Sequence, residues 1–184
     1  TVDPGTGNAK TSKSTQVLDS YGNVTQSRAY DFGTLTTPAR ETNIQYLTDW
    51  NYVQPYRGIR NRATTATVTQ NAVNGNLMAG TRVLFNNYYD QYNIANTTLE
   101  TSIGNAQQRT ASFDGNYSPR GNVTQTIAGG VSTQTKYDIT GMPRKTYVNN
   151  QETANVTAGT NNAVPQVITP FGNSNLSHSL SWNA

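Results

Sequence analysis

Runs of about six to eight residues rich in Thr, Val and Tyr recur along the chain, and Gly or Asn-Gly pairs separate them. Stretches with apolar residues three and four positions apart, which an amphipathic helix needs, do not occur. The pattern therefore predicts an all-β chain, built as an antiparallel hairpin array, with a β-sandwich as the second choice. We expect no helix longer than about two turns.

One hairpin is predicted for residues 122–137, turning at Gly129 and Gly130, because glycine tolerates the positive φ that tight hairpin turns need. Polar pairs then face each other across the strands, each contributing about 0.2–1 kcal/mol. The opposed pairs would be Thr124 with Thr135, Gln125 with Gln134, and Thr126 with Thr133. Neither face of such a hairpin is densely apolar.

A second hairpin is predicted for residues 62–85, turning at Asn74 and Gly75, a pair suited to the type I′ turn. A two-residue loop at this point places Ala66 opposite Val83 and Thr64 opposite Phe85. Ala79-Gly80 would then be the place for a bulge.

We divide the chain at residue 150. Residues 1–150 are expected to form the hairpin array, with an excursion between strands at 34–40. Residues 151–184 are rich in Asn and Thr and are interrupted by Pro165 and Pro170. We interpret 152–179 as a loop with at most one strand, around 164–168, and expect a terminal strand near the end.

A five-residue sequence occurs twice: Gly22-Asn23-Val24-Thr25-Gln26 recurs verbatim as Gly121-Asn122-Val123-Thr124-Gln125. A looser theme surrounds it, in which an aromatic or aliphatic residue precedes Asp and a turn Gly follows. The copies of this theme are Leu18-Asp19-Ser20-Tyr21-Gly22, Tyr30-Asp31-Phe32-Gly33, Tyr89-Asp90-Gln91-Tyr92-Asn93, where Asn replaces Gly, and Tyr137-Asp138-Ile139-Thr140-Gly141. Recurrence of this kind indicates a structural repeat.

Each position of the theme has a physical reason. Asp accepts hydrogen bonds from backbone N–H groups further along and closes an Asx turn. Gly supplies the left-handed conformation that reverses the chain. The aromatic residue anchors the end of the strand and packs on the next repeat. The residues expected to form this packing ridge between units are Tyr21, Tyr30, Tyr89 and Tyr137.

The motif Tyr-Asp-x-x-Gly followed by a short strand resembles the RHS/YD-repeat family. The resemblance covers residues 17–150 and, more weakly, 176–182, and Asp3-Pro4-Gly5 is similar to the turn between such repeats. Only Tyr137–Gly141 carries the full motif. The resemblance implies a YD-shell-like strip of hairpins from the repeat region of a secreted or cell-surface bacterial protein, without the C-terminal core or toxin. Its partners would be flanking repeats, or other copies bound through strand edges.

Composition narrows the function classes. Charged residues make up 12% of the chain, about half the usual share, and there is no cysteine to form a disulfide or a thiolate zinc site. No apolar run approaches the roughly 20 residues of a membrane span. Arg57, Arg60 and Arg62 lie close in sequence to Tyr52 and Tyr56, which is compatible with a nucleic-acid platform or with arginines stacked on neighbouring tyrosines. We favour the second interpretation and expect no nucleic-acid partner.

The common sequence patterns of catalysis are absent from the chain. His178 is the single histidine, no Gly-x-Ser-x-Gly elbow is present, and the glycine patterns of nucleotide sites are missing. We therefore expect no catalytic residue, no cofactor and no metal. Three functions remain: a structural scaffold segment, a self-assembling extracellular fibre subunit, or a carbohydrate-binding domain that uses Trp50, Tyr52 and Tyr56 for stacking.

Overall fold

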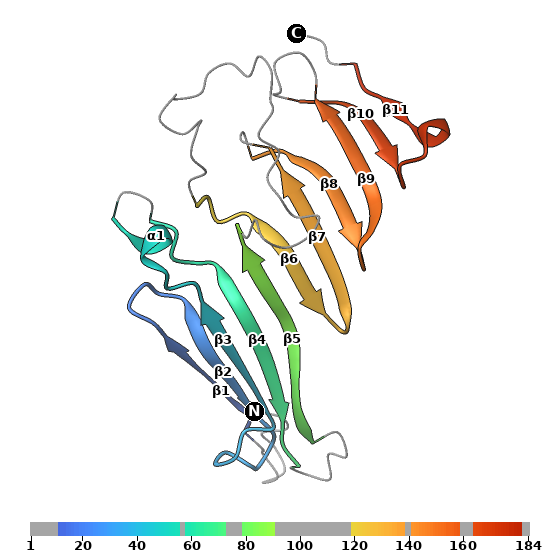
Figure 1. Ribbon diagram of the computed structural model, residues 1–184. Helices are drawn as coiled ribbons and strands as arrows, with labels where there is room; N and C mark the ends of the chain where they lie inside the picture. Colours follow the sequence, from blue (N-terminus) through green and yellow to red (C-terminus); the bar gives the residue numbers. More distant parts are fainter. Residues whose placement is uncertain are drawn as a thin grey trace. The chain divides into compact units, whose positions relative to one another are not determined.

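The computed structural model of the chain describes residues 11–55, 58–72, 79–90, 119–138, 141–158 and 164–181. Eleven strands form one open antiparallel sheet in which the order of strands in space is their order along the chain (Figure 1). They are β1 (Lys13–Leu18), β2 (Val24–Tyr30), β3 (Arg40–Tyr46), β4 (Ala63–Gln70), β5 (Gly80–Tyr89), β6 (Val123–Ala128), β7 (Val131–Tyr137), β8 (Pro143–Val148), β9 (Gln151–Ala158), β10 (Pro165–Pro170) and β11 (His178–Ser179). The predicted antiparallel hairpin array is confirmed.

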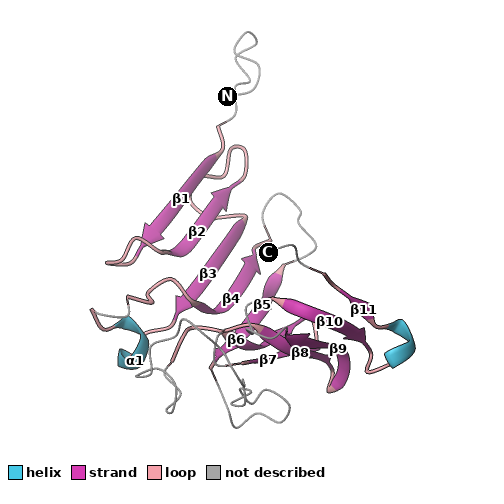
Figure 2. Cartoon of the chain, turned by 90° about the horizontal axis from the view of Figure 1, so that it is seen from above, coloured by secondary structure: helices cyan, strands magenta, loops and turns pink. Residues whose placement is uncertain are grey.

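Helix is scarce in the described part of the chain, as Figure 2 shows. The α-helix α1 spans Trp50–Val53 and the 3-10 helix η2 spans Ser174–Leu176. Neither described helix is long enough to cross a membrane. The expected excursion after β2 is present, because residues 31–39 connect β2 to β3.

The chain divides into two compact units, residues 1–86 and 87–184. In the first unit, Ala66 and Val68 on β4 are the most deeply buried apolar residues, at 2% and 1% exposed. Their register partners on β3, Ile44 and Thr42, point to the same face.

The opposite face of this unit carries a network of polar side chains. Gln26 on β2 donates to Asn43 on β3 at 2.9 Å, and Asn43 donates to Glu41 at 2.9 Å. Arg28 pairs with Glu41 at 2.6 Å across the same two strands. Cross-strand polar pairs of this kind stabilise a sheet that has no thick apolar layer on that face.

The hairpin at Gly129 and Gly130 forms as predicted. Both glycines have positive φ, +57° and +80°, which is the conformation of a type I′ turn. Gln125 faces Gln134 and Thr126 faces Thr133, as the sequence indicated.

The register predicted for the other hairpin is wrong. Ala66 faces Phe85, and Val83 faces Thr67. The bulge lies at Leu84 on β5, opposite Ala66 and Thr67, and not at Ala79-Gly80. Asn74 and Gly75 themselves lie outside the described residues. The pairs nearest the connection, such as Gln70 with Gly80, are one residue out of the predicted register, and the extra residue Leu84 on β5 adds one more for Ala66.

The interpretation of residues 152–179 as a loop with at most one strand is also wrong. Strand β9 begins at Gln151 and pairs along its length with β8 on one side and β10 on the other. Strand β10 begins and ends with the two prolines that suggested a break. Proline lacks only a donor N–H, so the first and last positions of a strand accept it.

Candidate functional site: the repeated aspartate turn

The turn between β1 and β2 is organised by the carboxylate of Asp19. Its Oδ1 accepts the N–H of Tyr21 at 2.8 Å and that of Asn23 at 2.9 Å, while the Asn23 side chain donates to Oδ2. The backbone closes the same turn, because the Asp19 N–H donates to the Asn23 carbonyl and the Gly22 N–H donates to the Asp19 carbonyl. Gly22 has φ +84°, so the turn needs a residue without Cβ.

Asp138 builds the corresponding turn between β7 and β8. Its N–H donates to the carbonyl of Met142, the Gly141 N–H donates to its carbonyl, and its Oδ1 accepts the Met142 N–H at 3.1 Å. Gly141 has φ +89°. The Asp138 side chain is fully buried, and Arg144 contacts it at 3.4 Å. A buried carboxylate needs such partners, because desolvation without them is costly.

Asp90 builds a third copy, although the sequence of its turn is interrupted. Its carboxylate accepts the N–H groups of Arg120, Gly121 and Asn122 at 2.9, 2.6 and 3.2 Å, and its own N–H donates to the Asn122 carbonyl. The turn glycine is therefore Gly121, with φ +72°. The assignment of Asn93 as the replacement for that glycine is wrong, and Asn93 lies outside the described residues.

The two identical five-residue sequences make matching contacts, except through their asparagine side chains. Asn23 Nδ2 donates to Asp19 and to the Arg60 carbonyl, whereas Asn122 Nδ2 has no hydrogen-bond partner among the described residues. Each glycine has positive φ, and each asparagine N–H donates to the turn aspartate. Each threonine hydroxyl donates to the carbonyl two residues before that aspartate: Thr25 to Val17 at 3.2 Å and Thr124 to Tyr88 at 3.1 Å. Each glutamine amide donates to a side chain on the next strand, Gln26 to Asn43 and Gln125 to Ser132. The repetition in sequence is therefore a repetition in structure.

The valine of each copy is bound by a tyrosine from the next strand. The Tyr46 hydroxyl at the end of β3 donates to the Val24 carbonyl at 3.2 Å, and that of Tyr137 at the end of β7 donates to the Val123 carbonyl at 2.9 Å. Burial raises the pKa of the Tyr137 hydroxyl. Tyr46 does not match the sequence theme, because Leu47 and not aspartate follows it.

Leu47 nevertheless occupies the aspartate position. Its N–H donates to the Arg62 carbonyl at 2.8 Å, as the Asp138 N–H does to Met142. The register agrees, since Tyr46 pairs with Ala63 and Tyr137 with Pro143, each just after a bulge. The β3–β4 connection is thus a repeat turn enlarged by a segment that contains α1.

Tyr30, Asp31 and Gly33 form a different turn. The Asp31 carbonyl accepts the N–H of Thr34 at 3.1 Å, and its Oδ1 accepts the N–H of the adjacent Phe32 at 2.7 Å. Gly33 has φ +78° but lies one position earlier than the glycine of the other copies. The Tyr30 ring lies under the ammonium group of Lys13, 5.0 Å from its centroid.

The expected ridge of four tyrosines is not uniform. Tyr89 is 7% exposed and buried at the end of β5, whereas Tyr21 is 52% exposed within its turn. Tyr21 therefore does not pack between successive repeats. The guanidinium of Arg60 instead lies over the Tyr21 ring, with its Cζ 4.8 Å from the ring centroid. Arg60 therefore stacks on a tyrosine, as expected for the arginines of residues 57–62. The tyrosine is Tyr21, however, and not one of the neighbouring residues in sequence.

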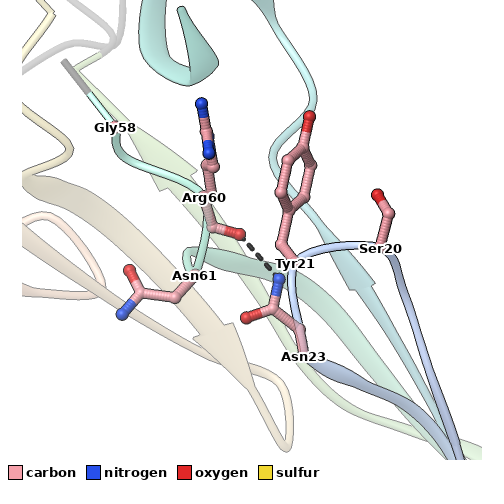
Figure 3. Close-up of a pocket in the computed structure, with 6 residues that line it drawn as sticks. All are labelled: Ser20, Tyr21, Asn23, Gly58, Arg60 and Asn61. Carbon is pink, nitrogen blue, oxygen red and sulfur yellow. Dashed lines mark hydrogen bonds between the residues drawn. The ribbon is translucent and has the colours of Figure 1, made fainter. Parts of the chain in front are cut away.

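Tyr21 and Arg60 border an open hollow of about 490 Å³, which we call the Tyr21–Arg60 hollow (Figure 3). Its lining residues are Ser20, Tyr21, Asn23, Gly58, Arg60 and Asn61. The Asn23 side chain donates to the Arg60 carbonyl at 2.8 Å, which fastens the enlarged turn to the Asp19 turn. Arg60 Nε donates to the Val53 carbonyl at 3.2 Å.

The aromatic platform proposed from Trp50, Tyr52 and Tyr56 does not hold for Tyr52. Tyr52 is 8% exposed and buried, while Trp50 is 67% exposed. Burial of the middle residue of α1 leaves no stacking surface at that position. Tyr56 and Arg57 lie outside the described residues.

Two carboxylates of the first unit have lowered pKa values. The Asn23 side chain, with the N–H groups of the turn, lowers the pKa of Asp19. Hydrogen bonds from Asn43 and Arg28 lower the pKa of Glu41. Both acids are therefore charged at neutral pH and hold their donors as ionised groups.

Among the residues that the structure describes, no three acidic, histidine or cysteine side chains gather as metal ligands. His178 lies exposed on β11. No protein-family model, curated protein or solved structure shows significant similarity to the chain.

Proposed function

We propose that the chain is a structural scaffold segment of a secreted or cell-surface repeat protein related to the RHS/YD-repeat family, and that it is not an enzyme. The observation that carries the proposal is the threefold recurrence of one turn, at Asp19, Asp90 and Asp138. In each copy the aspartate N–H donates to the carbonyl of the residue that follows the turn glycine. A turn that recurs with its hairpin is the building unit of a quasi-one-dimensional array.

The chemistry of the turn also supports a structural role. In each copy the carboxylate is occupied by N–H groups of its own turn, and in the Asp90 and Asp138 copies it is buried. A carboxylate held in this way is not available to a substrate as acid, base or nucleophile. Its contribution is to fix the end of one strand to the start of the next.

Localisation provides the test of the scaffold proposal. Antibodies raised against the chain should detect the intact protein in the culture medium, or on whole cells of the source organism, where added protease removes it. Recovery of the protein only from the protease-protected fraction would refute the surface role. Replacement of His178 with Ala should leave the stability of the chain unchanged; a hydrolytic activity lost with that change would refute the non-enzymatic assignment.

Assembly of copies through strand edges is the second candidate. Strand β1 is an edge strand of the sheet, and its residues Val17 and Leu18 are 50% and 56% exposed. Open edges invite strand addition. Light scattering coupled to size-exclusion chromatography distinguishes the two candidates, since a fibre subunit forms larger species as concentration rises. A chain that stays monomeric at high concentration rules out the fibre subunit.

A further inference from the structure

The Tyr21–Arg60 hollow has features that the scaffold role does not use. Arg60 is fixed by Nε to the Val53 carbonyl and by its ring contact with Tyr21. Among the described residues, the two terminal nitrogens of its guanidinium have no hydrogen-bond or ion-pair partner. Figure 3 shows this guanidinium and the Tyr21 ring lying side by side and pointing the same way.

The nearest carboxylate of the turn does not neutralise this cation. Asp19 accepts hydrogen bonds from the backbone of Tyr21 and from both nitrogens of Asn23, and makes no ion pair with Arg60 among the described contacts. The net charge of +3 also favours an anionic ligand over a cationic one.

We propose that the Tyr21–Arg60 hollow binds the carboxylate of an acidic sugar. A guanidinium presents two parallel N–H groups that match a planar carboxylate. The turn offers no nest of free N–H groups for a phosphate, because those of Tyr21 and Asn23 already donate to Asp19. Carboxylate is therefore the anion that this arrangement fits.

Size and lining indicate a sugar as the carrier of that carboxylate. The volume of about 490 Å³ lies within the range of small-ligand sites and exceeds what a simple anion fills. Ser20 and Asn61 are exposed and provide a hydroxyl and an amide for sugar hydroxyl groups. None of the described residues that line the hollow is aliphatic, which disfavours an apolar ligand.

The test is a titration of the full chain, labelled with ¹⁵N, with digalacturonate, with its uncharged methyl ester and with inorganic phosphate. Digalacturonate should shift the amide resonances of residues 20–23 and 58–61 with a dissociation constant on the order of 1 mM, since a single half-buried guanidinium supplies the charge. The methyl ester should bind at least about tenfold more weakly, because it offers the same rings without the charge.

Variants assign the effect to Arg60. Arg60→Met keeps the backbone carbonyl that holds Asn23 and should weaken digalacturonate binding about tenfold, while Arg60→Lys should weaken it less. Arg82→Met, on exposed β5 of the same unit, is the matched control and should not change it. Equal binding of the methyl ester, equal binding of inorganic phosphate, unchanged binding by Arg60→Met in a folded spectrum, or no localised shifts would each overturn the proposal.

Discussion

The carboxylate of Asp90 accepts the backbone N–H of Gly121 at 2.6 Å, although 31 residues separate the two positions. Asp138 accepts the N–H of Met142, the residue after its turn glycine, across only four residues. The turn therefore tolerates a long insertion between its aspartate and its glycine, because closure depends on the two ends and not on the segment between them. Loop closure entropy grows slowly with length, so such insertions cost little.

Replacement of Asp90 with Ala should lower the free energy of unfolding by about 2–4 kcal/mol, because three buried or partly buried N–H groups lose a charged acceptor. Urea unfolding at pH 7 measures the change. Asp49→Ala is the control, since Asp49 is exposed and caps α1 through the single N–H of Asn51. Its loss should cost about 0.5–1 kcal/mol. Equal effects of the two variants would contradict the proposed role of Asp90.

The two tyrosine contacts should be equivalent. Tyr46→Phe and Tyr137→Phe each remove one hydroxyl donor from a valine carbonyl and should each lower the free energy of unfolding by about 1 kcal/mol. Tyr21→Phe should have no measurable effect, since Tyr21 is 52% exposed. Thermal unfolding of the three variants measures these effects. If only one of Tyr46→Phe and Tyr137→Phe lowered the melting temperature, the two contacts would not be equivalent.

The hairpin at Gly129-Gly130 should tolerate asparagine better than valine. No atom lies within 4 Å of a Cβ built on Gly130, so the cost of a substitution comes from its φ of +80° alone. Gly130→Val should lower stability by about 1–2 kcal/mol, and Gly130→Asn by clearly less, because asparagine adopts the left-handed conformation more readily. Equal melting temperatures for the two variants would argue against the turn.

Stability should fall as the pH decreases below 4.5, the ordinary pKa of a glutamate such as Glu41. The folded pKa of Glu41 is lowered, so its contribution is present above that value and is lost as the pH falls through the folded pKa. The pKa of Asp19 is also lowered, so its contribution to stability is likewise lost as the pH falls below 3.8, the ordinary pKa of an aspartate. Glu41→Gln should reduce the difference in urea midpoint between pH 6 and pH 3, and an unchanged difference would exclude Glu41 as a source of it.

The sequence predicted the features that depend on neighbouring residues. The turn at Gly129-Gly130 and the register of its hairpin follow from two glycines between strands of matching polar residues. The aspartate turn of 137–141 also lies within five residues. In both cases the local backbone requirement determines the structure.

Features set by distant residues were not predictable in this way. Nothing near Asp90 indicates Gly121 as its partner, except that the five residues from Gly121 repeat those from Gly22. The duplication identifies the partner only once the contacts of Asp19 are known, because Asn23 and Asn122 then occupy equivalent positions. The stacking of Arg60 on Tyr21 joins residues of two different turns. Proline at both ends of β10 suggested a loop, because the sequence does not show at which strand positions the backbone N–H is not needed for a hydrogen bond to the neighbouring strand.

The central claim, that Asp90 closes a repeat turn with the second five-residue copy, is tested most directly by amide hydrogen exchange. Residue-resolved exchange should show the N–H groups of Gly121 and Asn122 protected in the original chain. In Asp90→Ala these two should exchange about tenfold or more faster, while those of Tyr21 and Asn23 in the Asp19 turn keep their rates. Unchanged exchange at Gly121 and Asn122 after the substitution would contradict the account.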